Sequence, residues 1–173
     1  MSIEEKKIID FKTSIKKDKA PPFSDGLYTW IMFLMNFYNR IKNTLKIDFE
    51  SFMIMQLVVS DYLYKTNKGG VKNFNELKKV FKDHTDILQE RKLNIASIAE
   101  VLNLPRETVR RKIMNLDKKK LLDYSRSGIS IGSQYKTVFN EFVSDTVDNI
   151  SQLIKKWESN GSLKELLELD KKL

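Results

Sequence analysis

The chain contains no cysteine, which excludes disulfide bonds, thiolate metal sites and cysteine nucleophiles. His84 is the single histidine, and one histidine with no second histidine or cysteine nearby makes a poor metal site. We therefore expect His84 to lie on the solvated surface, and we expect neither a metal nor a cofactor. The sequence has no glycine-rich phosphate loop, no zinc-binding spacing and no G-x-S-x-G elbow, so it predicts a protein that is not an enzyme.

Long apolar runs are also missing from the sequence. The N-terminal residues have no apolar signal core, and the most apolar stretch, residues 27–41, is interrupted by Asn36, Asn39 and Arg40. A membrane-spanning helix needs about 20 predominantly apolar residues. We therefore expect no contact with a membrane. A cytoplasmic location is expected, and the absence of cysteine suits that reducing compartment.

Positive charge is abundant and unevenly distributed. The chain of 173 residues has 31 Lys and Arg against 23 Asp and Glu, a formal net charge of +8. Residues 91–126 hold 10 of the basic residues and 4 of the acidic ones, a net of +6, which leaves only +2 for the remainder. A positive field concentrated on one segment is typical of a nucleic-acid binder.

Residues 94–131 begin with a pattern of two short helices joined by a sharp turn. Four apolar residues recur at the i, i+3, i+4 and i+7 spacing of one helix face, which predicts a helix over residues 95–102. These residues are Ile95, Ile98, Ala99 and Leu102. Asn103 tolerates the left-handed conformation that stops a helix. Pro105 suits the first position of the next helix, because its missing N–H would be unpaired there.

The second helix, predicted over residues 105–118, has an apolar face and a strongly cationic polar face. Val109, Ile113 and Leu116 share the apolar face and are expected to pack on the preceding helix. A helix in the DNA major groove uses such a polar face, since Arg and Lys reach guanine edges and phosphates. The residues expected at the DNA are Arg106, Thr108, Arg110, Arg111 and Asn115 in the groove, Glu107 on the same face, and Lys112, Lys118 and Arg126 on phosphates.

The residues after this helix predict a pair of strands. Leu121, Leu122 and Tyr124 are typical of a first strand, and Ile129 and Ile131 alternate with polar residues on a return strand. The dipeptide at residues 127–128, Ser-Gly, predicts a tight turn between them.

Residues 94–131 as a whole resemble the winged helix-turn-helix of bacterial transcription regulators, broadly the MarR-like group. The resemblance covers about a fifth of the chain. Asn103 stands where that family usually has glycine, and the strand turn lacks the family's charged Asp-x-Arg tip. The resemblance implies a mostly α fold with a small β-wing that binds double-stranded DNA. It rests on Ile98, Ala99, Leu102, Leu104, Val109 and Ile113 for the helical core, and on Arg106, Thr108, Arg110 and Arg111 for the reading helix.

We expect a single winged-helix domain over residues 24–173, with additional N- and C-terminal helices for dimerisation. The N-terminal helix is apolar on more than one side, and an apolar stripe from Val138 to Trp157 is longer than a small core needs. The predicted divisions are a mobile arm at 1–23, a dimerisation helix at 24–47, a winged-helix core at 48–134 with an inserted segment at 66–92, and C-terminal helices at 135–173.

Three capping signals mark expected helix starts. Residues 24–26, Ser-Asp-Gly, are expected to cap the N-terminal helix, and Asp48 the helix that follows it. Ser162 and Glu165 have the spacing of a capping box before a short final helix.

The leading functional hypothesis is a DNA-binding transcription regulator that acts as a homodimer. One reading helix touches only a few base pairs, whereas two related by a twofold axis reach half-sites roughly 34–36 Å apart. One alternative is a regulator that senses a small-molecule effector in a pocket between the aromatic helices and the core. Another is a winged-helix scaffold that binds protein. The scaffold predicts no salt-dependent affinity for DNA, whereas phosphate contacts require one.

Overall fold

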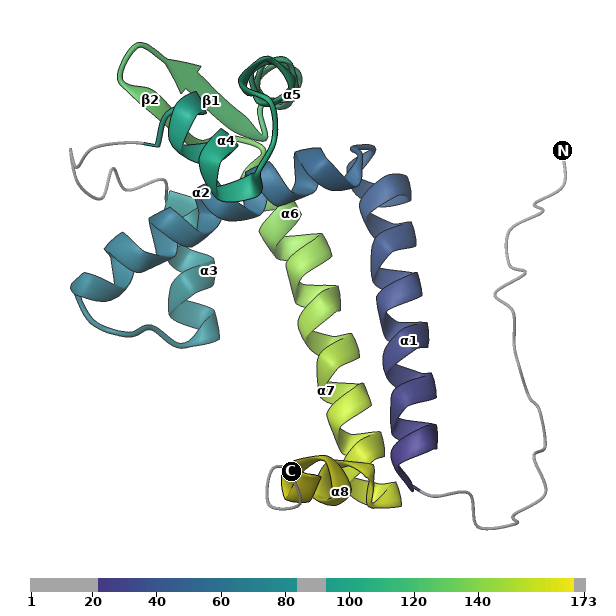
Figure 1. Ribbon diagram of the computed structural model, residues 1–173. Helices are drawn as coiled ribbons and strands as arrows, with labels where there is room; N and C mark the ends of the chain where they lie inside the picture. Colours follow the sequence, from purple (N-terminus) through teal and green to yellow (C-terminus); the bar gives the residue numbers. More distant parts are fainter. Residues whose placement is uncertain (1–21, 84–92, 170–173) are drawn as a thin grey trace, which may run out of the picture.

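The computed structural model, described over residues 22–83 and 93–169, consists of a head and a stalk (Figure 1). The head contains most of the short helices and a two-stranded antiparallel sheet, and the stalk is a pair of long helices that lie side by side. The mostly helical fold with one small sheet is as predicted. Most of the predicted arm, residues 1–21, and His84 lie outside the described residues, whereas Pro22 and Phe23 belong to the first helix.

The stalk is built from the two ends of the described chain. Helix α1 (Pro22–Arg40) continues into a π-helical turn, η1 (Ile41–Leu45). Its partner is a continuous helical stretch that starts at Tyr135, as predicted, and extends slightly further than Trp157. This stretch comprises α6 (Tyr135–Val138), the π-helical turn η2 (Phe139–Val143) and α7 (Ser144–Asn160), and α8 (Ser162–Glu168) then folds across the far end of the stalk.

The head follows the predicted order of elements. Residues 66–92 were expected to be an insertion, and in the described part of that range, up to residue 83, the structure has helix α3. The first three of those residues belong to α2, which is longer than predicted. The elements of the head are α2 (Phe49–Lys68), α3 (Phe74–Asp83), α4 (Ile95–Leu102), α5 (Arg106–Lys118), β1 (Leu122–Ser125) and β2 (Gly128–Ile131).

The three capping predictions have different outcomes. Asp48 caps α2 as predicted, and its carboxylate accepts a hydrogen bond from the Ser51 backbone N–H at 2.7 Å. The predicted cap at residues 24–26 is wrong, because α1 begins at Pro22 and Asp25 lies in its first turn. The cap of α8 is misplaced by one residue, because Gly161 occupies the N-cap position and Ser162 is the first helical residue.

An aromatic joint connects the stalk to the head. Phe142 from the second stalk helix lies 5.6 Å from Phe37 of α1 and 6.0 Å from Phe52 of α2, measured between ring centroids. Arg40 closes the joint, because its guanidinium lies 4.7 Å from the centroid of the Phe142 ring and donates a hydrogen bond to the Phe142 carbonyl at 2.8 Å. Buried aromatic pairs of this kind contribute about 0.5–1.5 kcal/mol each beyond the area they bury.

The far end of the stalk is held by polar contacts between its two helices. The indole N–H of Trp157 donates to the Thr29 hydroxyl at 2.8 Å, and the Asn160 amide donates to the Asp25 carboxylate at 2.5 Å. Thr29 in turn donates to the backbone of α1, so the indole and the hydroxyl are both satisfied. These bonds determine which side of each stalk helix faces inward.

Helix α3 packs against the start of the second stalk helix. Phe81 of α3 lies 4.6 Å from Phe139 and 5.3 Å from Tyr135 between ring centroids, and Phe74 lies 5.8 Å from Phe139. The apolar face of α3 therefore extends the core of the head towards the stalk and leaves the opposite end of the head free.

Candidate nucleic-acid interface

The turn between α4 and α5 has the geometry that its sequence predicts. Asn94 and Ser97 form a reciprocal capping box at the start of α4, with the Ser97 N–H donating to the Asn94 side chain at 2.9 Å. Asn103 ends that helix at φ 50° and ψ 46°, in the left-handed region. The N–H of Leu104 donates to the Ala99 carbonyl at 3.0 Å, and Ala99 is buried. Pro105 occupies the N-cap position of α5, one residue before its predicted place.

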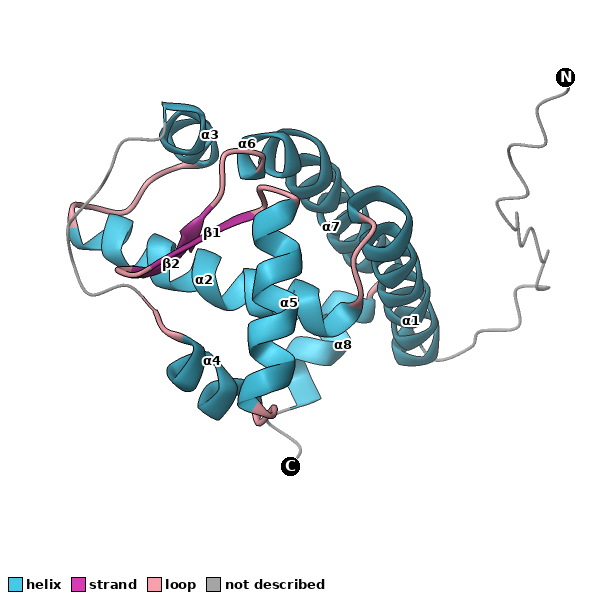
Figure 2. Cartoon of the chain, turned by 90° about the horizontal axis from the view of Figure 1, so that it is seen from above, coloured by secondary structure: helices cyan, strands magenta, loops and turns pink. Residues whose placement is uncertain are grey.

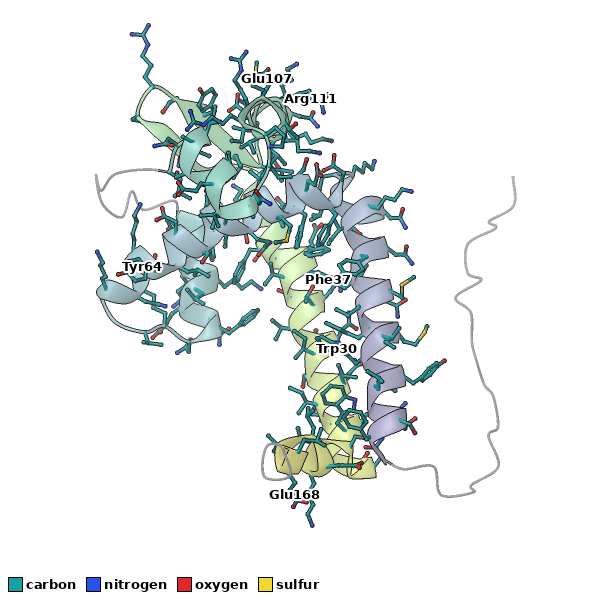
Figure 3. The ribbon with its side chains drawn as sticks, viewed as in Figure 1. Trp30, Phe37, Tyr64, Glu107, Arg111 and Glu168 are labelled. Carbon is teal, nitrogen blue, oxygen red and sulfur yellow. The ribbon has the colours of Figure 1, made fainter. Side chains whose placement is uncertain are left out.

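Helix α5 lies on the free end of the head, facing away from α8 (Figure 3). Val109, Ile113 and Leu116 are completely buried against the other helices of the head. Seen from above, α5 lies over α2, between the β1–β2 hairpin and α1 (Figure 2). The labelled side chains of Glu107 and Arg111 point outward from this end of the molecule.

Most of the residues predicted to contact DNA are exposed on this surface. The exposed predicted residues are Arg106, Glu107, Arg110, Arg111, Asn115 and Lys118 on α5, and Arg126 in the hairpin turn. The guanidinium of Arg110 bonds to the Glu107 carboxylate at 3.2 Å, and both side chains are largely exposed. Thr108 is half-buried, so its hydroxyl is less accessible than predicted. We call the exposed set the α5 cationic face.

The β1–β2 hairpin stands beside the α5 cationic face and is attached to it. The Tyr124 backbone N–H of β1 donates to the Asp117 carboxylate of α5 at 3.1 Å. On the other side, the Ile129 N–H of β2 donates to the Leu93 carbonyl at 2.9 Å, which adds an isolated bridge to the sheet. The turn residues are Arg126 and Ser127, one position earlier than predicted, because Gly128 pairs with Ser125 as part of β2.

Lys112 is not placed as the sequence predicts. It was expected on a DNA phosphate, yet its side chain is only 12% exposed and is bonded within the chain. Its ammonium lies 2.8 Å from the Asp48 carboxylate and 3.0 Å from that of Glu50, both at the start of α2. Sequence reasoning missed this pairing because the residues that bind Lys112 are more than sixty positions away in the chain.

The charges of this clamp stabilise one another. Burial alone would lower the pKa of Lys112, but the hydrogen bonds with Asp48 and Glu50 outweigh it and raise that pKa above its usual value. Burial would likewise raise the pKa of Asp48, but hydrogen bonds from Lys112 and from Ser51 hold that pKa below its usual value. Lys112 therefore orients α5 on α2 and takes no part in the α5 cationic face.

Replacing Lys112 by methionine is expected to lower the free energy of unfolding by about 1 kcal/mol. The effect is small because both carboxylates that bind Lys112 are at least half exposed, so solvent screens the ion pairs. Under the DNA-binding hypothesis, the slope of DNA affinity against salt is expected to stay unchanged, because the Lys112 ammonium is bonded to Asp48 and Glu50. Urea unfolding and salt-titrated DNA binding measure the two effects. Lys118→Met, at an exposed position, is the matched control, with unchanged stability and a reduced slope. A reduced salt slope for Lys112→Met would contradict this expectation and would indicate that Lys112 contacts a phosphate.

The contribution of the clamp to stability has a defined pH range. Folding lowers the pKa of Asp48, so its contribution is present above the unfolded-state pKa and is lost as the pH falls through the folded-state value. Folding raises the pKa of Lys112, so its contribution is present below the unfolded-state pKa and is lost as the pH rises through the folded-state value. The stability difference between Lys112→Met and the wild type should therefore shrink in acid.

The structure also exposes residues beside the α5 cationic face that the sequence analysis did not predict. Met114 is exposed on α5. It follows Arg111 by three positions, so the helical repeat alone places it on the same face as Arg111. An apolar side chain there is suited to the methyl group of thymine. Lys119 and Lys120 are exposed at the end of α5 and add two cations beside the hairpin.

Within residues 22–83 and 93–169, no cluster of three or more His, Asp or Glu residues is arranged to hold a metal ion. None of the helices described there is both long enough and apolar enough to cross a membrane. Comparisons of the chain with protein-family models, with curated proteins and with solved structures found no match.

Proposed function

We propose that this protein is a winged-helix DNA-binding transcription regulator that acts as a homodimer, with α5 as its reading helix. In this proposal α2, α4 and α5 are the three core helices and the β1–β2 hairpin is the wing. The observation that carries the proposal is the α5 cationic face, which lies at the free end of the head with a cationic hairpin turn beside it. A helix that only supports a core has no need of so many exposed cations.

The proposed contacts follow from geometry and chemistry. Arg111 and Asn115 are four residues apart on the outer side of α5, where a major groove would lie, and both have side chains that form bidentate bonds with bases. Lys118 at the end of α5 and Arg126 in the hairpin turn are placed for phosphates on either side of that groove. The inward-facing Lys112 is left out of the contacts.

The experiment that tests this proposal is selection of genomic DNA fragments by the purified full chain, followed by salt titration of the selected fragments. We expect fragments enriched above background and an affinity that falls steeply with salt, by about 0.9 in logarithmic slope for each phosphate contact. An affinity that is absent or insensitive to salt would contradict the proposal and favour the protein-binding scaffold.

One observation favours a regulator that also responds to a small molecule. A groove of about 880 Å³ lies where α1 meets α2, and its residues include apolar, aromatic and cationic side chains. It touches Asp48, which bonds to Lys112 of α5, so a ligand there would adjoin the clamp that orients the reading helix. A thermal shift of the full chain with a panel of aromatic carboxylates tests this second function. The absence of a shift with every compound would count against it.

A further inference from the structure

Most of the exposed large apolar residues of the stalk lie on one side of it. On α1, five large apolar residues that recur at helical spacing are 37–49% exposed, namely Phe23, Leu27, Trp30, Ile31 and Tyr38. On α7, three further residues with the same kind of spacing are 39–45% exposed, namely Val147, Ile150 and Ile154. Together with Leu166 of α8, we call these residues the apolar stalk face. Monomeric proteins rarely expose a continuous apolar surface of this extent.

The contacts within the stalk show that these residues share one side. A groove at the foot of the stalk is lined by Leu27 and Trp30 of α1, Trp157 of α7 and Leu166 of α8. Val147, Ile150 and Ile154 precede Trp157 by ten, seven and three residues, so they lie on or beside its side of α7. At the other end, Tyr38 makes an edge-on contact with Phe49 of α2 at 5.3 Å between centroids, which carries the apolar surface up to the head.

The opposite side of the stalk is markedly more polar. A second groove there lies between α1 and α7, and asparagine, glutamine, threonine and lysine side chains make up much of its lining. These polar residues are Asn36, Asn39, Asn43 and Thr44 on the α1 side and Asn149, Gln152 and Lys156 on α7. Thr29, Phe37 and Arg40, which hold α1 on the second stalk helix, border this second groove. The residues of the apolar stalk face are therefore exposed on the other side of that contact.

We infer that the apolar stalk face binds the same face of a second copy of this chain, with the two stalks parallel, in a four-helix bundle. This inference rests on the proposed function for its parallel orientation. The face approaches the size of a dimer interface, since 19 residues of α1 extend over about 28 Å and two helices side by side are roughly 20 Å wide, a flat footprint of about 560 Å². A stable interface needs about 800 Å² of accessible surface on each partner. Accessible surface is larger than the flat footprint, because side chains protrude from the helices.

A second copy fits this face better than a smaller ligand does. Residues that recur every three or four positions form ridges, and the ridges of one helix pair fit the grooves of another at the small crossing angles of helix bundles. The residues of this face are apolar on both stalk helices, so a contact between two copies of it would pack apolar side chains against apolar side chains. The positive charge concentrated around α5 stays at the distal end, away from the contact.

The parallel orientation follows from the position of the reading helix. Because α5 lies at the end of the head that faces away from α8, a twofold axis along the stalk turns both reading helices to the same side. An antiparallel pair would place the two heads at opposite ends, where they could not share one DNA duplex. In the parallel pair α1 of one copy packs mainly on α7 of the other.

The oligomeric state is tested first by light scattering without DNA. The wild type is expected at about 40 kDa, twice the 20.3 kDa of the chain. Ile31→Glu and Ile150→Glu place a carboxylate in the contact and should raise the dissociation constant at least about 100-fold, to a mass near that of the single chain. Both positions are exposed in the single chain, so folding should be retained, which circular dichroism verifies. Asn36→Glu, on the polar side of the stalk, is the matched control and should remain a dimer.

The orientation is tested by disulfide crosslinking. Because the chain has no cysteine of its own, only the introduced cysteines can form disulfides. Leu27→Cys and Ile154→Cys each lie within one helical turn of the hydrogen bond between Thr29 and Trp157, in the lower part of the stalk. A mixture of the two variants is expected to form a disulfide-linked dimer after subunit exchange and mild oxidation. Leu27→Cys mixed with Gln152→Cys, on the polar side, should not. In an antiparallel pair the foot positions of the two copies lie about a stalk length apart and would not react.

Two results would overturn the inference. One is a wild-type mass near that of the single chain, or a dimer that persists in both glutamate variants. The other is a wild-type dimer in which foot-level cysteines crosslink neither alone nor in the mixture. All these measurements are made without DNA, so they can succeed or fail independently of the proposed reading role of α5.

Discussion

Replacing Gly132 by alanine is expected to lower the free energy of unfolding by about 3 kcal/mol, at the upper end of the usual cost of overpacking. A Cβ at this position would lie 2.3 Å from the Lys120 carbonyl oxygen and 2.7 Å from its carbon. It would also lie 2.8 Å from the backbone carbon of Leu121. All three atoms belong to the backbone, which cannot move aside as the end of a flexible side chain can.

Hydrogen bonds hold both sides of this contact in place. The Gly132 N–H donates to the Leu121 carbonyl at 3.0 Å, and the Gln134 N–H donates to the Lys120 carbonyl at 2.9 Å. Lys120 is itself in the left-handed conformation, at φ 57°. Relieving the clash would therefore break bonds at the base of the β1–β2 hairpin, where β2 leads into α6.

Urea unfolding followed by circular dichroism measures the effect, with Gly69→Ala as the matched control. A Cβ at Gly69 would meet only the Thr66 carbonyl oxygen, at an ordinary contact distance of 3.5 Å, and the φ there is −85°. That variant is expected to be as stable as the wild type, or slightly more so. If the free energy of unfolding of Gly132→Ala is within about 0.5 kcal/mol of the wild-type value, the close backbone contacts described at Gly132 are contradicted.

Arg111→Ala is expected to weaken binding to a selected DNA site about 10- to 100-fold, with a smaller loss on random DNA. Arg111 lies at the centre of the α5 cationic face, and a bidentate bond to guanine contributes about 1–3 kcal/mol of discrimination. Random DNA offers its phosphates but not the right base, so it loses only a general electrostatic attraction.

Lys118→Ala is the comparison that separates base reading from charge. Lys118 is exposed at the C-terminal end of α5, where we propose a phosphate contact, so its loss should weaken specific and random binding equally. It should also lower the logarithmic salt slope by about 0.9. Fluorescence anisotropy with a selected and a scrambled duplex at several salt concentrations measures both quantities. An equal loss on the two duplexes for Arg111→Ala would refute its base-reading role.

The local elements of the head were largely determined by the sequence itself. The i, i+3, i+4 and i+7 spacing gave α4 its observed limits, and Asn103 adopts the left-handed conformation that its type and place predict. Asp48 caps α2 as expected, and the apolar residues of α5 are buried on the predicted side. Signals of this kind succeed because the responsible groups are within a few residues of one another, so the backbone decides the outcome.

The relations between distant segments depend on the tertiary packing and could not be read from the sequence. Lys112 has the sequence signature of a phosphate contact, but Asp48 and Glu50 of α2 come close enough to bind it. The apolar residues of α1 looked undivided in the sequence, and the bonds of Thr29 and Arg40 to the second stalk helix determine which of them face outward. Such outcomes depend on how helices pack, because a side chain pairs with whichever group the fold brings near it.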